Sequence, residues 1–111
     1  MADKHDATLM IQLAQWGTSM GLEDAMQVVL ADDFDVENAD PDNKLVARVL
    51  MFCETLGTLT KNGLLDTDLV LDWLWVEGMW TRVGPAALKS RHKHGVPELY
   101  EYFEALAAKQ S

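Results

Sequence analysis

The sequence predicts an all-α fold, a single compact bundle of five to six helices. Apolar residues recur at helical spacing along nearly all of the 111 residues, and no stretch shows the sustained alternation of a half-buried strand. Hydrophobic residues make up 49% of the chain, enough for a core that needs neither a metal nor disulfides. Because no repeat and no interdomain linker is visible, we assign residues 1–111 to one helical domain.

Two helices are predicted before the middle of the chain. We expect Asp6 to be the N-cap of the first, which ends near Gly17, so that residues 1–6 form an N-terminal tail. The second is expected over residues 22–31, because it opens with two acidic residues that suit the first turn of a helix. Residues 32–40 then form an acidic connector without helical periodicity.

The third helix is the best-defined element of the sequence. Asp40-Pro41 is expected to open it, since an acidic N-cap followed by proline suits the first helical position. Asn62-Gly63 is expected to end it with a residue in the left-handed conformation. Its apolar residues fall on one wide arc and are predicted to be buried: Leu45, Val46, Val49, Leu50, Phe52, Cys53, Leu56 and Leu59.

The second half of the chain predicts two or three further helices. Asp66 caps a fourth segment over residues 67–76 that is apolar almost all round, so we expect it to be central in the fold. The next segment, residues 79–94, is expected to be kinked or split at Gly84-Pro85, because a proline there removes a backbone donor. Pro97 is expected to start the last helix.

The charge of the chain is strongly negative and unevenly distributed. Eighteen acidic and nine basic residues give a net charge of −9. Residues 1–42 hold ten acids and one base, whereas the remaining residues hold eight of each. We therefore expect neither a nucleic-acid nor a membrane partner, because both surfaces would repel the chain. A basic protein or a basic patch is the partner that this charge favours.

The compartment is predicted from cysteine usage and from the absence of targeting signals. A lone cysteine, Cys53, cannot form an internal disulfide and is typical of a reducing environment. The first six residues lack the positive region of a signal peptide. The longest uncharged run, residues 7–22, is too short and too polar to cross a bilayer. We expect a cytoplasmic protein.

The acidic connector resembles a calcium-binding loop only superficially. Asp33, Asp35 and Glu37 stand at alternate positions, as calcium ligands do in an EF-hand. That pattern requires a glycine at the sixth position and a glutamate at the twelfth, where this chain has Asn38 and Lys44. We therefore expect no calcium site.

No other pattern of residues indicates catalysis or a cofactor. His92 and His94 point about 200° apart on a helix and cannot share a metal ion there. Cys53 lies on an apolar face, where it has no base to activate it. A glycine-rich phosphate loop, a nucleophile elbow and a zinc-protease motif are all missing from the sequence. We assign no catalytic, cofactor or metal residue and expect no cofactor.

Tryptophans in the fourth segment predict a contact surface. Trp73 and Trp75 stand two residues apart in a predicted helix, so they cannot face the same way. One of them, or the neighbouring Val76, must meet a second helix layer or a partner. We expect Trp73, Trp75 and Val76 to be interface residues, and the chain to form a homodimer with Trp75 in the contact.

Several motifs resemble those of a family of small bacterial all-helical domains of unknown function. The similarity covers about residues 40–108. It implies a helix ending in E-x-L-G, a glycine turn, a short apolar helix, a helix bearing Trp and Arg, and a Y-x-Y-F-E-x-L helix. No activity, cofactor or catalytic residue comes with the resemblance. The matching residues are Leu50–Gly57, Asn62–Asp66, Trp80, Pro85, Arg91 and Leu99–Leu106.

These observations favour a bacterial protein of unknown function that acts as a non-enzymatic protein–protein interaction module. Two other classes stay open. The first is an acidic inhibitor, antitoxin-like or nucleic-acid-mimicking, whose carboxylates imitate phosphates. The second is a small enzyme whose site combines dispersed acids with Arg82 or Arg91.

Overall fold

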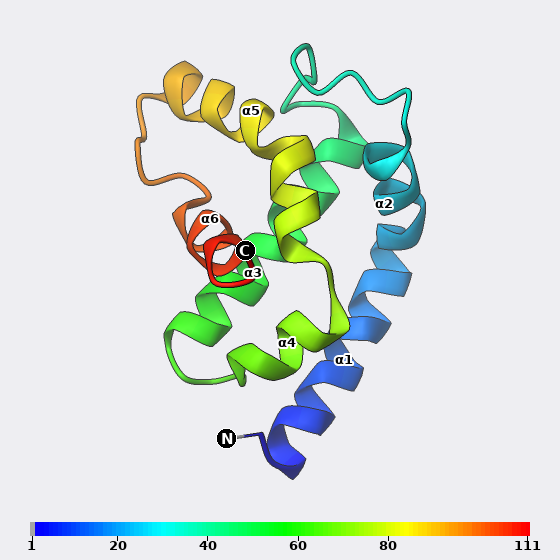
Figure 1. Ribbon diagram of the computed structural model, residues 1–111, viewed down its shortest axis with the longest axis vertical. Coiled ribbons are helices and arrows are strands. Elements are labelled where there is room, and N and C mark those ends of the chain that lie inside the picture. The colour runs from blue at the N-terminus through cyan, green and yellow to red at the C-terminus, as the bar shows by residue number, and fades with distance from the viewer. Residues whose placement is uncertain (1) are drawn as a thin grey trace.

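Six helices and their connections account for residues 2–111, which are the residues that the computed structural model describes (Figure 1). This part of the chain contains no strand, which confirms the predicted all-α fold. No helix in the described range has both the length and the apolar character that a bilayer crossing requires. The helices are α1 (Lys4–Met20), α2 (Leu22–Leu30), α3 (Lys44–Lys61), α4 (Thr67–Trp73), α5 (Val76–His94) and α6 (Glu101–Ala108).

Helix α1 begins before the predicted position and ends after it. Its N-cap is Asp3, not Asp6, because the two carboxylates form a reciprocal capping box with each other's backbone N–H groups, at 3.0 and 2.9 Å. The tail predicted over residues 1–6 is therefore wrong for residues 4–6, and residue 1 lies outside the described part of the chain. Gly17 does not stop the helix, since Gly21, at φ +77°, supplies the left-handed end.

Helix α3 starts three residues after the predicted Asp40-Pro41 opening. Asn43 is the N-cap, because its carboxamide oxygen accepts hydrogen bonds from the backbone N–H groups of Leu45 and Val46 at 2.9 and 3.3 Å. Asp40 instead accepts a bond from a backbone N–H inside the preceding turn. The predicted C-terminal stop is confirmed, since Gly63 has φ +71° directly after the helix.

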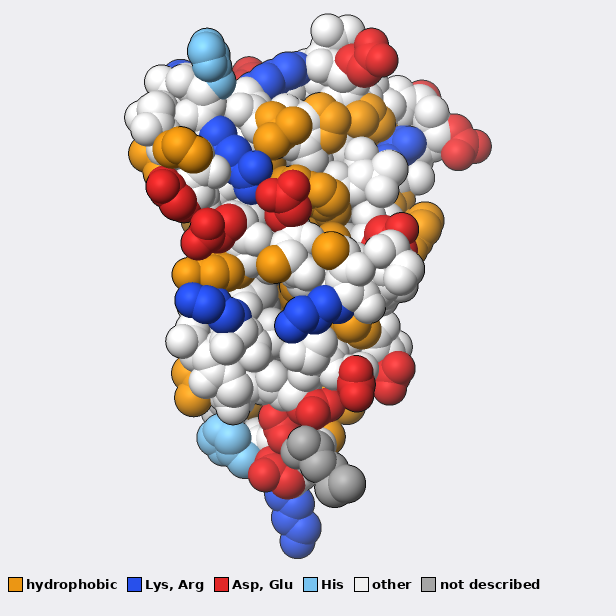
Figure 2. All heavy atoms as spheres, turned by 60° about the vertical axis from the view of Figure 1, so that its left-hand side comes forward, with side chains coloured by type: hydrophobic (Ala, Val, Ile, Leu, Met, Phe, Trp, Pro, Cys, Tyr) orange, Lys and Arg blue, Asp and Glu red, His pale blue; other side chains and the backbone are white. Residues whose placement is uncertain are grey.

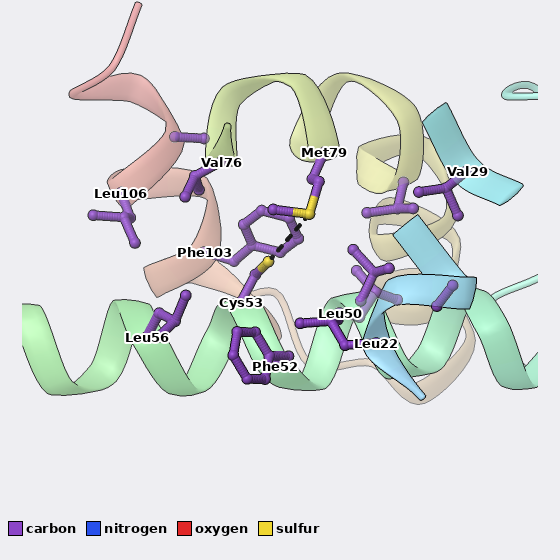
Figure 3. Packing of buried hydrophobic residues seen from close by; sticks show 14 of the residues in the cluster. Leu22, Val29, Leu50, Phe52, Cys53, Leu56, Val76, Met79, Phe103 and Leu106 are labelled. Carbon is purple, nitrogen blue, oxygen red and sulfur yellow. Dashed lines mark hydrogen bonds between the residues drawn. The ribbon is translucent and has the colours of Figure 1, made fainter. Parts of the chain in front are cut away.

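The core is built around α3, as Figure 3 shows. Phe52, Cys53 and Leu56 are completely buried, which confirms the predicted inner face of this helix, although Leu45 and Leu59 near its ends are only partly buried. The Cys53 thiol donates to the Met79 sulfur of α5 at 3.9 Å, and burial raises the pKa of this thiol. From α6, Phe103 completes the same cluster. Helices α3, α5 and α6 therefore share one continuous apolar interior.

The apolar segment over residues 67–76 is not one central helix, contrary to our expectation. Helix α4 ends at Trp73, and the next two residues are not helical. Only Val70 of α4 is buried, and the helix lies at the edge of the fold in Figure 1. The break is stabilised by Gln110, whose carboxamide donates to the carbonyls of Leu71 and Leu74 and accepts from the N–H of Glu77.

Helix α5 passes through Gly84-Pro85 without splitting, although its ribbon changes direction along its length in Figure 1. The last helix begins at Glu101, after a turn, and not at Pro97. The late start has a tertiary cause. The Glu54 carboxylate of α3 accepts a hydrogen bond from the N–H of Phe103 at 2.8 Å and so caps α6 from another helix.

The predicted acidic connector is confirmed as non-helical and is bound to α5 near both of its ends. Arg82 donates to the carbonyls of Val29 and Ala31, where the connector leaves α2. Lys89 donates to the carbonyls of Glu37 and Ala39 at 2.5 and 3.2 Å. Lys93 pairs with the Asp42 carboxylate at 2.6 Å. Three cations of α5 thus hold the most acidic segment of the chain.

Candidate functional site

The three predicted interface residues occupy different environments. Val76 is completely buried in the core, so its assignment to an interface is wrong (Figure 3). Trp73 is half-buried and packs edge-on against Phe52 at a ring distance of 6.2 Å. Trp75 leaves 62% of its surface exposed. The break between α4 and α5 separates these residues, because it turns Trp75 outward and Val76 inward.

The remaining tryptophans pack against the core. Trp16 lies 5.2 Å from Phe52, and Trp80 lies 5.0 Å from Phe103 in an edge-on arrangement. Of the four tryptophans, only Trp75 has most of its surface free for a contact outside the chain.

The Trp75 indole has a defined place on the first turn of α5. A Cβ atom on Gly78 would overlap the indole ring, so the ring lies directly on the glycine backbone. Gly78 itself is buried. The glycine therefore allows an exposed aromatic side chain to lie flat on the helix. The sequence signal for this arrangement is a glycine three residues after a tryptophan.

Two hollows lie beside α2, one near its C-terminal end against the start of α5 and one near its N-terminal end against α1 and the end of α4, and we call the two together the α2 groove. The first has a volume of about 480 Å³ and the second about 250 Å³. Leu22, Met26 and Leu30 line them from successive turns of α2. In Figure 1, the connection between α4 and α5 lies beside the junction of α1 and α2. The other lining residues are Asp32, Trp75, Glu77, Gly78, Thr81 and Arg82 in the first hollow, and Ala14, Gly17, Thr18, Glu23, Trp73 and Leu74 in the second.

Apart from Trp73, Trp75 and Arg82, sequence reasoning did not assign any residue of this groove to a site. The available signal was the spacing of Leu22, Met26 and Leu30, which repeat every four residues along one side of α2. Ala25 and Val29, on the adjacent side of the same helix, are completely buried. Leu22 is buried as well, so the apolar surface of α2 that the core leaves partly uncovered is that of Met26 and Leu30.

The charges at the α2 groove are mainly acidic. Glu23, Asp32 and Glu77 line it, together with a single cation, Arg82. The Arg82 guanidinium is already engaged, since its Nε atom donates to the Val29 carbonyl at 2.7 Å and a second nitrogen donates to the next carbonyl of the α2 end. The groove therefore combines an apolar wall with acidic side chains.

Arg91, the second arginine predicted for an enzymatic site, also binds groups of its own chain. Its Nε atom donates to the Leu99 carbonyl at 2.6 Å, and a terminal nitrogen pairs with Glu104 at 2.9 Å. Its guanidinium carbon lies 5.9 Å from the Trp80 ring centre. Nearby, burial raises the pKa of Glu54, whose carboxylate caps α6. These contacts join α3, α5 and α6.

A third hollow, of about 370 Å³, lies near the N-terminal end of the chain and contains polar groups with capping roles. The Asp6 carboxylate accepts backbone hydrogen bonds from Asp3 and Asp66, and these bonds lower its pKa. It thereby joins the start of α1 to the start of α4. Within the described residues, no group of three or more His, Cys, Asp or Glu side chains has an arrangement that suits a metal ion.

The face drawn in Figure 2 shows no single large apolar patch. In Figure 2, its hydrophobic side chains lie in separate groups, with Lys, Arg, Asp and Glu between them. Acidic side chains gather at the lower end of this view. Of the exposed apolar residues, Leu88 and Val96 lie on either side of the last turn of α5, which carries Arg91, His92, Lys93 and His94.

The structure defines a small all-helical domain with an apolar, acid-lined groove. The chain belongs to the family described as a domain of unknown function (DUF4760), which it matches over residues 3–110. No curated protein and no solved structure matches it. The prediction of a small domain of unknown function is therefore confirmed.

The residues that suggested the resemblance have structural roles in this fold. Glu54 caps α6, and Leu56 is completely buried. A Cβ atom on Gly57 would lie 2.5 Å from the carbonyl carbon of Tyr102, so this glycine permits close contact between α3 and α6. Arg91 binds the turn before α6. The matching motifs therefore specify how the helices pack and do not form the α2 groove.

Proposed function

We propose that this chain is a non-enzymatic protein-interaction module that binds its partner in the α2 groove. The supporting observation is the exposed Trp75, which lies flat on Gly78 at the edge of an apolar hollow. Aromatic anchors beside well-formed pockets are typical of the central residues of protein interfaces. An exposed apolar surface bordered by polar groups is typical of interaction sites.

The two other functional classes find less support in the contacts. A nucleic-acid-mimicking or antitoxin-like inhibitor needs an unopposed array of carboxylates, whereas Arg82, Lys89 and Lys93 hold the acidic connector. A small enzyme built on Arg82 or Arg91 would need guanidinium groups that face a substrate. Both arginines donate to carbonyl groups of their own chain.

The proposal includes a cytoplasmic setting in a bacterial cell. The single cysteine, Cys53, is buried and unpaired, as is usual in a reducing compartment. The bacterial origin is supported by the resemblance of the motifs. The homodimer that the sequence predicts would use the same Trp75 surface and is therefore the rival of a different partner; light scattering over a concentration series tests it directly.

Site-specific photocrosslinking in the native host tests the proposed function. A photoreactive amino acid at Thr81 stands at the groove, and one at Thr58 of α3 is the matched control. Both threonines are exposed, and each hydroxyl donates to the carbonyl four residues earlier, so the two positions are structurally equivalent. We expect a discrete crosslinked protein from Thr81 alone, and we expect Trp75→Ala to remove it. The same product from both positions, or no product, would contradict the proposal.

A further inference from the structure

We propose that the occupant of the α2 groove is a basic, amphipathic helical segment of another protein. This inference rests on the proposed function and specifies its partner class. It depends on three properties of the groove: the spacing of its apolar residues, the charge around it and the use that the chain makes of its own cations.

The length of the apolar wall suits a short helix. Met26 and Leu30 are the apolar residues of this wall that stay partly or largely exposed, and they stand four residues apart on α2, about 6 Å along the axis. Leu22, on the same side of the helix, is 5% exposed and belongs to the core. A partner helix with apolar residues at positions i and i+4 has the same spacing, so two of its anchors match Met26 and Leu30. The Trp75 indole lies opposite the end of α2 that carries Leu30, in the same hollow.

The secondary structure of the domain favours a helix over an added strand. Strand addition requires an exposed sheet edge with unpaired backbone groups. Residues 2–111 form no strand, and most of the groove is lined by side chains of the helices α1, α2, α4 and α5. An amphipathic helix that lays its apolar face in such a groove needs no sheet edge. A proline-rich extended segment needs none either, and a peptide of that kind separates the two modes in the test.

The charge at the groove selects a basic segment. Glu23, Asp32 and Glu77 lie along it, and the positive charge of Arg82 is directed at the carbonyl end of α2. The whole chain adds a net charge of −9. Lysines and arginines on the outer face of a bound helix would lie near these carboxylates, which speeds association and excludes acidic competitors.

A second copy of the chain does not supply such a segment. Five of its nine cations, Lys61, Arg82, Lys89, Arg91 and Lys93, already bind groups of the same chain. A symmetric dimer through the groove would also place each acidic wall near its own copy. The chemistry of the groove is therefore complementary to a different protein.

Titration calorimetry with designed peptides tests the inference. The first peptide, of about 16 residues, carries leucines at i, i+4, i+7 and i+11 with lysines and arginines on the other face. A second peptide has the same composition in scrambled order, and a third replaces every cation by glutamate. A fourth is a proline-rich basic peptide. We expect the first to bind at least about tenfold more tightly than the other three, with affinity that falls as salt rises.

Variants of the groove locate the binding. Trp75→Ala removes the exposed ring, and Gly78→Ala keeps the ring but forces it off the helix. Glu77→Gln removes one carboxylate of the groove. We expect the first two to weaken binding about tenfold and the third to reduce its salt dependence. Leu88→Ala is the control: it removes an exposed leucine that lies outside the groove and should leave the affinity for the first peptide unchanged. A thermal melt of each variant verifies folding.

Each alternative result has a distinct meaning. Equal binding of the acidic or the scrambled peptide would overturn the partner class while leaving the groove as a docking site. Stronger binding of the proline-rich peptide would replace the helix by an extended ligand. A doubled mass that Trp75→Ala reverses would identify a second copy as the occupant. If no peptide binds but Thr81 still crosslinks, the proposed function stands and the basic helix is refuted. If neither assay gives a signal, both proposals fall.

Discussion

Replacing Phe52 by alanine is the most direct test of how the core is built. The Phe52 side chain is completely buried in α3, with the Trp16 ring 5.2 Å away on one side and the Trp73 ring 6.2 Å away on another. It therefore connects α1 and α4 to the central helix. Phe52→Ala removes the phenyl ring and both aromatic pairs, and it leaves a cavity that the fixed helices fill only in part.

The expected loss of stability is large for a domain of this size. Phenylalanine-to-alanine changes at buried positions cost about 3–5 kcal/mol, and each aromatic pair adds about 0.5–1.5 kcal/mol beyond burial. Trp16 and Trp73 are only half-buried and relax toward the cavity, so we expect about 4 kcal/mol for Phe52→Ala. Domains of this length have a total stability of about 5–15 kcal/mol. The variant should therefore lose a large share of it.

Urea unfolding followed by circular dichroism measures this loss. With an m-value of about 1.5 kcal/mol/M, a loss of about 4 kcal/mol lowers the midpoint by about 2.5 M. Met51→Ala is the matched control, because Met51 is the neighbouring residue and leaves 57% of its surface exposed. It should cost less than about 1 kcal/mol. A loss below about 1 kcal/mol for Phe52→Ala, or equal losses for both variants, would refute the assignment of the inner face of α3.

Two further predictions concern the contacts between helices. Gly57→Ala should destabilise the domain by more than about 2 kcal/mol, because the new methyl group overlaps the backbone of Tyr102. Gly63→Ala is the control: a methyl group there contacts no atom, and the cost of a non-glycine residue at φ +71° is only about 1–2 kcal/mol in the same urea assay. Asp6→Asn should remove part of the acid sensitivity of the domain. Backbone hydrogen bonds from Asp3 and Asp66 lower the pKa of Asp6. The stabilisation by this carboxylate is therefore present above pH 3.8 and disappears as the pH falls through the lowered pKa. An unchanged slope of the free energy of unfolding against pH in the variant would contradict this role.

Local sequence was sufficient for much of the helical framework. The buried arc of α3, the stop at Gly63 and the start of α4 after Asp66 depend on periodicity and on capping within a few residues, and the structure confirms all three. The absence of helix from the acidic connector is local in the same sense. Such features are readable because their stabilising contacts lie within one or two turns of the residues that make them.

Tertiary contacts decided the features that the sequence did not predict. Helix α6 starts late because Glu54 caps it from 49 residues away, and the break before α5 depends on Gln110 from the end of the chain. That break places Val76 in the core and leaves Trp75 exposed over Gly78. A local pattern states which residues are apolar, but not which of them the rest of the chain covers. The α2 groove exists because the chain buries Leu22, Ala25 and Val29 of α2 but leaves Met26 and Leu30 partly uncovered.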